Sequence, residues 1–428
     1  MKKSVVVSIK LLLLVTLFLV SGFVAGKNIT LTVLSSQDQI RDAEVKLAEK
    51  FTQKTGIKID FQIIPSEQFD NLLATRLNSG ECTDLFMGQS GTLIIGPKYN
   101  VTKNCVDLTG EPWTKRFDPT VLSAVTFNKK VYGCLLWDVS NPWCFVYNKQ
   151  VFKKLGITAP KTYADFKAAC ETIKAAGITP IYEPISDGWH HVLMFPEMGA
   201  RLNELHPGLY DQLNKNQIKL ADLPEAQKLL KQNLEISQYF GKNSFADTYS
   251  DTSRSLATGQ FAMTVRQPTY PVEFAKDMPD SKLTADDFGV FVMPFLDNQF
   301  KNMNPAGPAH FIYSGGKHIK ESRAYLRFLT TVENAQFYLD NNPLFTWLPV
   351  TGVKPKESKQ MKELNASVKK SGVVMQAGVS YIDPQWMQIG KDMQDMFLGQ
   401  LTPKQVLQNV DKRRSEQALA QKDPAWAK

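Results

Sequence analysis

An alternation of strand-like and helix-like segments over residues 29–88 is the feature that most constrains the fold. Strand-like runs lie at 29–34, 57–63 and 84–88, and helical spacing of apolar residues lies at 40–51 and 69–77. Gly56 and Gly80 follow the two helical stretches as stop signals. Parallel strands need crossover connections, which helices supply. The sequence therefore predicts an α/β fold with a mainly parallel sheet flanked by helices.

Length and composition add a domain count and exclude one class of partner. The chain has 428 residues, which predicts two domains at roughly 100–200 residues per domain. Hydrophobic residues make up 43% and charged residues 21%, as is usual for a globular protein. The formal net charge of +8 is spread along the chain, without a basic block interleaved with aromatic residues. Nucleic acid is therefore not expected as a partner.

The first 26 residues have the pattern of a secretory signal peptide. Lys2 and Lys3 precede an apolar run over 11–20, and small residues lead up to Gly26. The run is shorter than the roughly 20 apolar residues that a membrane-spanning helix needs. Phe23 stands where a lipoprotein signal would carry its Cys. We expect cleavage after Gly26 and a soluble, unanchored protein in the periplasm or outside the cell.

The five cysteines are consistent with two arrangements. None stands in a CxxC motif or a Cys/His cluster, so neither a metal site nor a cofactor is predicted. Export permits disulfides, and the first pairings to test are Cys82–Cys105 and Cys134–Cys144, with Cys170 free. The second arrangement is five buried thiols, because the sequence alone does not fix connectivity.

Polar residues follow the first and third predicted strands. Ligands of open α/β sheets bind outside the carboxyl ends of the strands. Ser36 and Asp38 follow the first strand and Gln89 ends the third, and their side chains offer hydrogen bonds that suit a neutral polyol. Asp38 also precedes a predicted helix by two residues, so capping of that helix is its second possible role.

Several tryptophans stand in loop-like contexts, near Gly, Pro, Asp or His. They are Trp137, Trp143, Trp189, Trp347 and Trp386. Packing in a core is the default role of any one tryptophan, but several in loops favour platforms on which the apolar face of a sugar stacks. The sequence has no GxSxG, HExxH or P-loop motif, and the adjacent His190 and His191 are badly spaced for a metal. No enzyme is predicted.

A series of short motifs identifies a resemblance. In chain order they are LAEKF at 47–51, TGIKI at 55–59, TDLF at 83–86, VYG at 131–133, VYNK at 146–149, GQFAM at 259–263 and TPKQVL at 402–407. With these motifs the chain resembles the family 1 extracellular solute-binding proteins of bacterial ABC importers, the family that includes the maltose-binding proteins. The resemblance extends from residue 29 to about 407.

The resemblance implies a two-lobe periplasmic-binding-protein fold of type II, with hinge crossovers and a solute in the cleft. Lobe 1 is expected to comprise 27–137 and 267–343, and lobe 2 to comprise 138–266 and 344–428. It also implies a polar contact to sugar at Asp38, aromatic stacking at Trp189 and Trp386, and a place for Arg266 at the second crossover. The complete predicted ligand-binding set is Ser36, Asp38, Gln89, Trp137, Asp138, Trp189, His190, Arg266, Trp347 and Trp386.

The predicted function is that of a monomeric solute receptor. It binds a carbohydrate, expected to be an oligosaccharide, by hinge closure and delivers it to the permease subunits of an ABC transporter. Arg266 and the basic charge balance leave open an anionic solute, such as a glycerophosphate or an acidic sugar. The sequence also leaves open a polysaccharide-active hydrolase and a receptor that feeds a sensor kinase.

Overall fold

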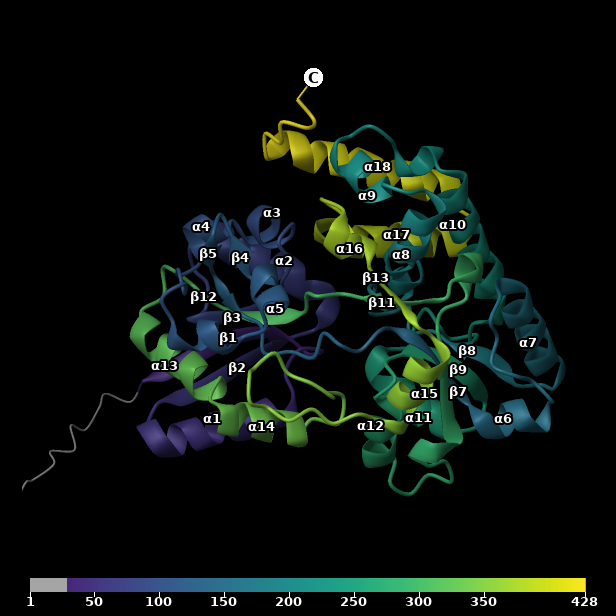
Figure 1. The fold of residues 1–428 in the computed structure, drawn as a ribbon, viewed down its shortest axis with the longest axis horizontal. Coiled ribbons are helices and arrows are strands. Elements are labelled where there is room, and N and C mark those ends of the chain that lie inside the picture. The colour runs from purple at the N-terminus through teal and green to yellow at the C-terminus, as the bar shows by residue number, and fades with distance from the viewer. Residues whose placement is uncertain (1–28, 428) are drawn as a thin grey trace, which may run out of the picture.

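Two lobes lie side by side in the computed structural model, which describes residues 29–427 (Figure 1). Lobe 1 holds the N-terminal segments, and lobe 2 holds most of the middle of the chain and its C-terminal helices. The predicted two-lobe α/β fold is confirmed. The predicted signal peptide and its cleavage after Gly26 lie outside the described residues.

The sheet of lobe 1 has the strand order β2-β1-β3-β12-β6. Its strands are β1 (Thr30–Ser36), β2 (Lys58–Ile64), β3 (Leu85–Gln89), β12 (Pro308–Ile312) and β6 (Gly133–Cys134). Strands β2, β1 and β3 run parallel, and β12 is antiparallel to both β3 and β6. The predicted β-α-β-α-β opening is therefore confirmed, and the later strand β12 extends it.

The first two helices explain this arrangement. Helix α1 (Asp42–Thr55) buries Leu47 and Phe51 on one face, and it ends at Gly56, whose φ of 75° lies in the left-handed region that favours glycine. Helix α2 (Ser66–Ser79) likewise buries a single apolar face and ends at Gly80. Each helix carries the chain back to the start of the next parallel strand. The carboxyl ends of β1 and β3 therefore meet at one edge of the sheet.

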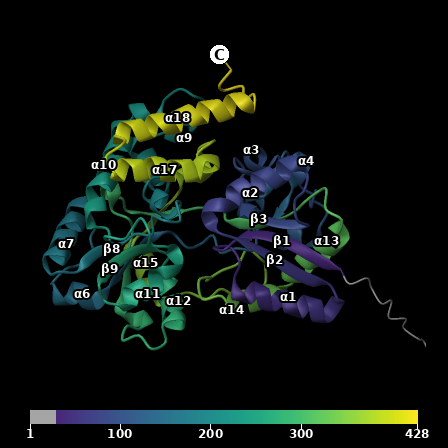
Figure 2. The same cartoon turned by 180° about the vertical axis from the view of Figure 1, so that it is seen from behind.

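The sheet of lobe 2 has the strand order β10-β7-β9-β8. The strands are β7 (Cys144–Asn148), β8 (Thr179–Tyr182), β9 (Phe261–Arg266) and β10 (Phe288–Phe291). The C-terminal helices α17 (Trp386–Phe397) and α18 (Pro403–Ala420) pack on one another over this lobe, as both views show (Figure 2). No helix among residues 29–427 has the length and apolar character that a membrane crossing requires.

The remaining elements are shorter or cover the two sheets. The strands are β4 (Thr126–Phe127), β5 (Lys130–Val131), β11 (Phe300–Met303) and β13 (Lys370–Val373). The helices are α3 (Ile95–Tyr99), α4 (Val101–Asn104), α5 (Pro119–Ala124), α6 (Lys149–Lys154), α7 (Tyr163–Ala175), α8 (Gly199–Leu205), α9 (Leu209–Asn214), α10 (Pro224–Ile236), α11 (Thr252–Ala257), α12 (Tyr270–Asp277), α13 (Ile319–Leu329), α14 (Val332–Asp340), α15 (Lys359–Ser367) and α16 (Met375–Gly378).

Two of the predicted lobe boundaries are wrong. Strand β10 pairs with β7, so this part of the segment 267–343 belongs to lobe 2. Leu344, Phe345 and Leu348 pack in the core of lobe 1, although 344–428 was predicted to belong to lobe 2. An apolar pattern identifies a strand or a buried turn, but it does not identify the sheet against which the segment packs. The chain therefore crosses between the lobes at 135–143, 304–307 and 351–358.

The cysteines are all unpaired, so the two predicted disulfides are wrong. Cys134 ends the sheet of lobe 1 and Cys144 begins the sheet of lobe 2, so these two residues belong to different cores. Cys82 and Cys105 are also free, and only Cys82 is partly exposed. Burial raises the pKa of the Cys105, Cys134 and Cys144 thiols. Four of the five cysteines are therefore buried thiols in these cores.

Candidate functional site

A cavity of about 270 Å³ lies between the lobes, and residues from both lobes and from two crossovers line it. Its lining combines polar side chains, aromatic rings and a few charged groups. Within residues 29–427, no group of three or more His, Cys, Asp or Glu side chains is placed to hold a metal ion. The mixture of polar and aromatic groups in the lining suits an organic solute.

The lobe 1 wall is built at the carboxyl edge of the sheet. Ser36 ends β1, Gln89 ends β3, and Asp38 follows β1, and all three line the cavity as predicted. Ser66, the first residue of α2, donates a hydrogen bond to the Asp38 carboxylate, and its Oγ lies 3.1 Å from Ser36 Oγ. No side chain caps the start of α1, so the second possible role of Asp38, as the cap of that helix, is wrong.

The lobe 2 wall is aromatic. Trp143, Trp189 and Tyr249 form one cluster, with ring centroids 5.9 Å apart between the two indoles and 5.0 Å apart between Trp189 and Tyr249. Trp386 Nε1 donates to the Trp189 carbonyl oxygen at 3.0 Å, which joins a fourth ring to this wall. Of these, Trp189 and Trp386 belong to the predicted site, and Trp143 and Tyr249 do not. All four line the cavity.

Trp137 forms a separate aromatic surface on the first crossover. Its ring contacts Phe345 edge-on at 4.8 Å, and the guanidinium of Arg41 lies 5.1 Å from its centre. Trp137, Phe345 and Arg41 all line the cavity. The predicted placement of Trp137 at the cavity is therefore correct.

His190 and Arg266 lie outside the cavity wall, which contradicts their predicted contact with solute. His190 is fully buried behind Trp143 and Trp189, with Nδ1 at 2.5 Å from Glu183 and Nε2 at 3.0 Å from the carbonyl oxygen of residue 265. Arg266 ends β9 inside lobe 2 rather than on a crossover, and it forms an ion pair with Glu273. Both residues therefore support the aromatic wall from behind.

Asp138 lines the cavity, but protein donors occupy its carboxylate. Oδ1 accepts from the backbone N–H and the hydroxyl of Ser140, at 2.8 and 2.6 Å. Oδ2 accepts from Asn141 Nδ2 at 2.7 Å, from the backbone N–H and hydroxyl of Thr346 at 2.5 and 2.9 Å, and from the N–H of Trp347 at 3.1 Å. Asp138 thus joins the first crossover to residues 344–347.

Trp347 is the third predicted residue that is absent from the cavity wall. Its backbone donates to Asp138, and its ring packs against the core of lobe 1. The sequence context, close to Pro349 and Gly352, is that of a loop, but the loop folds onto the core of its own lobe. The structure therefore places Trp347 against the core of lobe 1 and not with the predicted residues that line the cavity.

One charged cluster spans the cavity from lobe to lobe. Lys98 Nζ of α3 lies 3.0 Å from Asp70 Oδ2 of α2 and 3.9 Å from Asp383 Oδ2 of the short 3-10 helix η9 (Asp383–Gln385) in lobe 2. Burial raises the pKa of Asp383 to about 6, although the nearby Lys98 opposes the shift. Burial by itself lowers the pKa of Lys98, but the two carboxylates outweigh it and raise that pKa.

Sequence reasoning missed most of the polar wall. The missed residues are Gln39, Arg41, Ser66, Asp70, Lys98, Asn141, Glu197, Gln267, Asn302, Asn304, Gln376 and Asp383. Ser66 follows the second strand, so the rule that identified Ser36 could also have found it. Gln39 and Gln267 also follow strands, and the rest lie on or beside helices, on β11 and on crossovers, where no local pattern separates them from ordinary surface residues.

Comparison with known proteins shows to which family the chain belongs. A family model described as bacterial extracellular solute-binding protein matches residues 37–336. The chain belongs to this family. The resemblance inferred from the short motifs is thus confirmed, and the family description indicates a protein that works outside the cytoplasm.

Three similar proteins illustrate the range of the solute-binding family. The multiple sugar-binding protein of Streptococcus mutans is 23% identical over 340 residues, which covers 77% of each chain. The diacetylchitobiose binding protein DasA of Streptomyces coelicolor is 33% identical over 175 residues, 39% of each chain. The solved structure of a chitin oligosaccharide binding protein aligns with a TM-score of 0.76 at 22% identity, over 92% of this chain and 100% of that one, which shows a shared fold.

Proposed function

We propose that this solute-binding protein captures an oligosaccharide in the cavity between its lobes and delivers it to the membrane permease of an ABC importer. The observation that carries the proposal is the wall of Trp143, Trp189 and Trp386 opposite the polar edge of Ser36 and Asp38. Sugars present apolar ring faces and hydroxyl edges, which match these two walls. The names of the relatives, which refer to sugars, support the same class of solute.

The proposed mechanism is hinge closure. Solute that touches both walls binds the closed state better than the open one, and it shifts the equilibrium toward closure by that difference in affinity. The three crossovers are the segments that can absorb the change in backbone angles. We propose that the protein acts as a monomer without catalysis, that no nucleic acid takes part, and that it is exported by a signal peptide cleaved after Gly26.

The experiment that tests the sugar-binding proposal is a thermal-shift screen of purified protein over neutral oligosaccharides, uronates and phosphates. A solute that binds only the folded state raises the melting temperature. We expect stabilisation by at least one neutral oligosaccharide, which calorimetry then quantifies. If no neutral sugar stabilises the protein and a phosphate does, the proposed substrate class is wrong.

Replacing Trp386 with Ala is expected to weaken binding of that sugar by about 1–3 kcal/mol, because an aromatic ring at a binding surface is a typical hot spot. The matched control is Trp347→Ala, which removes a tryptophan outside the cavity wall. It should lower the melting temperature and leave the affinity unchanged. Equal losses of affinity in both variants would contradict stacking at Trp386. Calorimetric titration gives both affinities.

An anionic solute is the second candidate, and Arg41 is the observation that favours it. Its guanidinium lies at the cavity and its Nε has no hydrogen-bond partner among the described residues. The substitution Asp38→Asn separates the candidates by the sign of its effect. Affinity for a neutral sugar should fall by about 1.5–3 kcal/mol, because hydrogen bonds to a charged group are the stronger ones. Affinity for an anion should rise, because a repelling carboxylate is lost. Calorimetry on the best solute from the screen measures the sign.

A further inference from the structure

Three polar side chains form a buried cluster at the lobe 2 wall of the cavity. They are Glu197 of the 3-10 helix η3 (Pro196–Met198), Asn302 of β11 and Gln376 of α16, and each is 1–2% exposed. Gln376 Nε2 donates to Glu197 Oε1 at 2.6 Å. Within residues 29–427, Glu197 Oε2, Gln376 Oε1 and both amide atoms of Asn302 have no hydrogen-bond partner.

Unpaired polar atoms of this kind need an explanation, since buried polar groups are almost always hydrogen-bonded. Here four such atoms gather at one wall of the cavity that both lobes line. A solute that reaches this wall supplies the missing partners. We interpret the cluster as part of a ligand-binding site.

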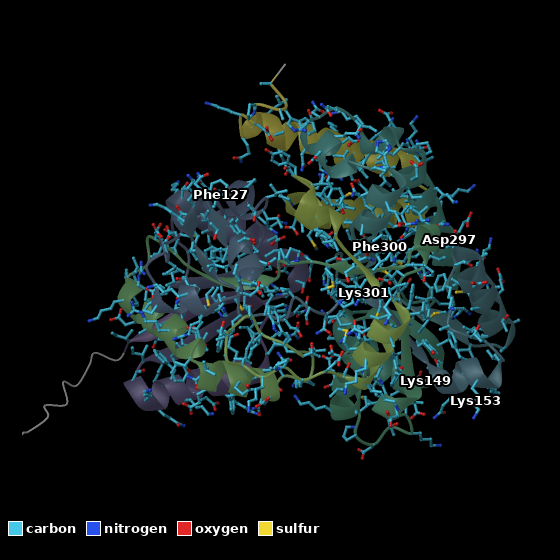
Figure 3. The ribbon with its side chains drawn as sticks, viewed as in Figure 1. Phe127, Lys149, Lys153, Asp297, Phe300 and Lys301 are labelled. Carbon is cyan, nitrogen blue, oxygen red and sulfur yellow. The ribbon has the colours of Figure 1, made fainter. Side chains whose placement is uncertain are left out.

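The fold holds the three residues together from separate parts of the chain. Strands β11 and β13 pair in parallel, with Asn302 opposite Gly372, and the N–H of residue 374 continues the pairing to the carbonyl oxygen of Met303. Helix α16 then starts at Met375, next to Gln376. Figure 3 shows Phe300 and Lys301, which precede Asn302 on β11, near the middle of the molecule.

A glycine lets the segment that carries Glu197 approach this pair. A Cβ atom at Gly199 would lie 2.4 Å from the backbone nitrogen of Met375. Any other residue at position 199 would therefore push η3 and α16 apart. This close approach brings the Glu197 and Gln376 side chains within hydrogen-bonding distance.

The charged groups around Glu197 are engaged elsewhere. Arg201 of α8 bonds to the carbonyl oxygen of Leu296 and forms an ion pair with Glu204. Lys301 of β11 bonds to Asn365 at 2.7 Å. The titratable neighbours are His191 of the 3-10 helix η2 (His190–Met194), bonded to a carbonyl oxygen at 2.8 Å, and Tyr210 of α9, which donates to the carbonyl oxygen of Val373 at 2.6 Å.

Burial favours the protonated form of the Glu197 carboxyl. Burial raises the pKa of Glu197 to about 8, and the hydrogen bond from Gln376 lowers it less. At neutral pH, Oε1 accepts from Gln376 and the protonated Oε2 is free to donate. Together with Asn302 and Gln376, the cluster then offers donors and acceptors without a net charge.

We propose that Glu197, Gln376 and Asn302 form a neutral subsite that binds an uncharged saccharide substituent able both to donate and to accept hydrogen bonds. A ring hydroxyl and an acetamido group share this chemistry. An ionised acidic substituent would enter a buried wall with no cation in the cluster to pair with it, so the subsite rejects it. This inference rests on the proposed sugar-binding function and specifies which sugars the cavity takes.

The test begins with four probes for wild-type protein: raffinose, cellobiose, diacetylchitobiose and digalacturonate. Binding of any neutral probe, together with at least tenfold weaker binding of the uronate, supports the subsite. Preference for diacetylchitobiose over cellobiose would assign the acetamido group, and the reverse would assign the hydroxyl. If no neutral probe binds, the proposed function fails and the subsite fails with it. Equal binding of the uronate overturns the subsite alone.

Glu197→Gln is the decisive variant, because glutamine has the shape of the protonated acid and cannot ionise. Wild-type affinity for the neutral probe should fall about tenfold between pH 7 and 9, as one proton is lost from a group with a pKa near 8. Asp383, whose pKa burial raises to about 6, is mostly ionised throughout this range. The affinity of Glu197→Gln should stay within about threefold of wild type at pH 7 and remain flat up to pH 9.

Two further variants complete the experiment. Asn302→Ala should lower the affinity for the neutral probe at least tenfold at pH 7. This variant keeps the subsite testable if Glu197→Gln does not fold. Glu204→Gln is the control, because Glu204 lies outside the cavity in ion pairs with Arg201 and Lys370. It should retain the pH profile of wild type. A Glu197→Gln protein that still loses tenfold in affinity by pH 9 would overturn the role of Glu197.

Discussion

Replacing Asp138 with Ala is expected to lower the free energy of unfolding by about 3–5 kcal/mol, because the change breaks a buried hydrogen-bond network. The Asp138 side chain is 3% exposed, and its carboxylate accepts six hydrogen bonds from Ser140, Asn141, Thr346 and Trp347. Alanine leaves the backbone N–H groups of residues 346 and 347 without that acceptor. Urea or thermal unfolding of the ligand-free protein measures the loss.

Asp138→Asn is the matched control. The amide keeps one acceptor oxygen and the shape of the side chain, but it places an NH₂ group where protein donors now point. We expect a smaller loss than for alanine. A change of less than about 1 kcal/mol in the alanine variant, together with a clear loss of sugar affinity, would instead support the role predicted from the sequence, in which Asp138 binds solute hydroxyls.

Replacing Lys98 with Met is expected to cost about 3 kcal/mol of folding stability at pH 7, at the lower end of the range for removing one partner of a buried ion pair. The Lys98 and Asp383 side chains are only 15% and 7% exposed, whereas Asp70, at 38%, can be hydrated after the change. Methionine retains most of the apolar stem, so the loss reports the charge. Because the pair joins lobe 1 to lobe 2, closure of the cavity should also become less favourable.

The pH dependence of this loss follows from Asp383. Its pKa is raised to about 6 in the folded protein, above the ordinary value of 3.8, so the protonated form is favoured in the fold. The stability that the protein gains from protonating Asp383 is present at low pH and is lost as the pH rises through 6. Without Lys98 the pKa should rise further. The Lys98→Met variant should therefore be closer to wild type at pH 5 than at pH 7.

Lys276→Met is the control for the Lys98 prediction. Lys276 pairs with Asp42 of lobe 1 at 3.1 Å, also between lobes, but both side chains are more than half exposed. An exposed pair contributes little to stability, so this variant should unfold like wild type at both pH values. If the two lysine variants lose the same stability, burial does not set the strength of the Lys98 contact.

Local pattern was enough to predict the first half of lobe 1 and the edge of its sheet that lines the cavity. The strands β1 to β3 and the helices α1 and α2 form where apolar spacing and two terminal glycines predict them. Because parallel strands end at one edge, Ser36, Asp38 and Gln89 could be placed at the cavity from the sequence. Trp137 could be found from its loop-like context, and Trp189 and Trp386 from that context together with the family resemblance.

Only the tertiary structure decided which segments belong to which lobe and which polar groups meet. Strand β10 joins β7, and residues 344–350 pack in lobe 1, through contacts between residues far apart in the chain. The same long-range packing buries His190, uses Asp138 to join two crossovers, and unites Glu197, Asn302 and Gln376 at one wall. The spacing of apolar residues within a segment indicates which of its side chains are buried. Contacts between residues far apart in the chain depend on how the lobes pack, and for that reason they could not be predicted from the sequence.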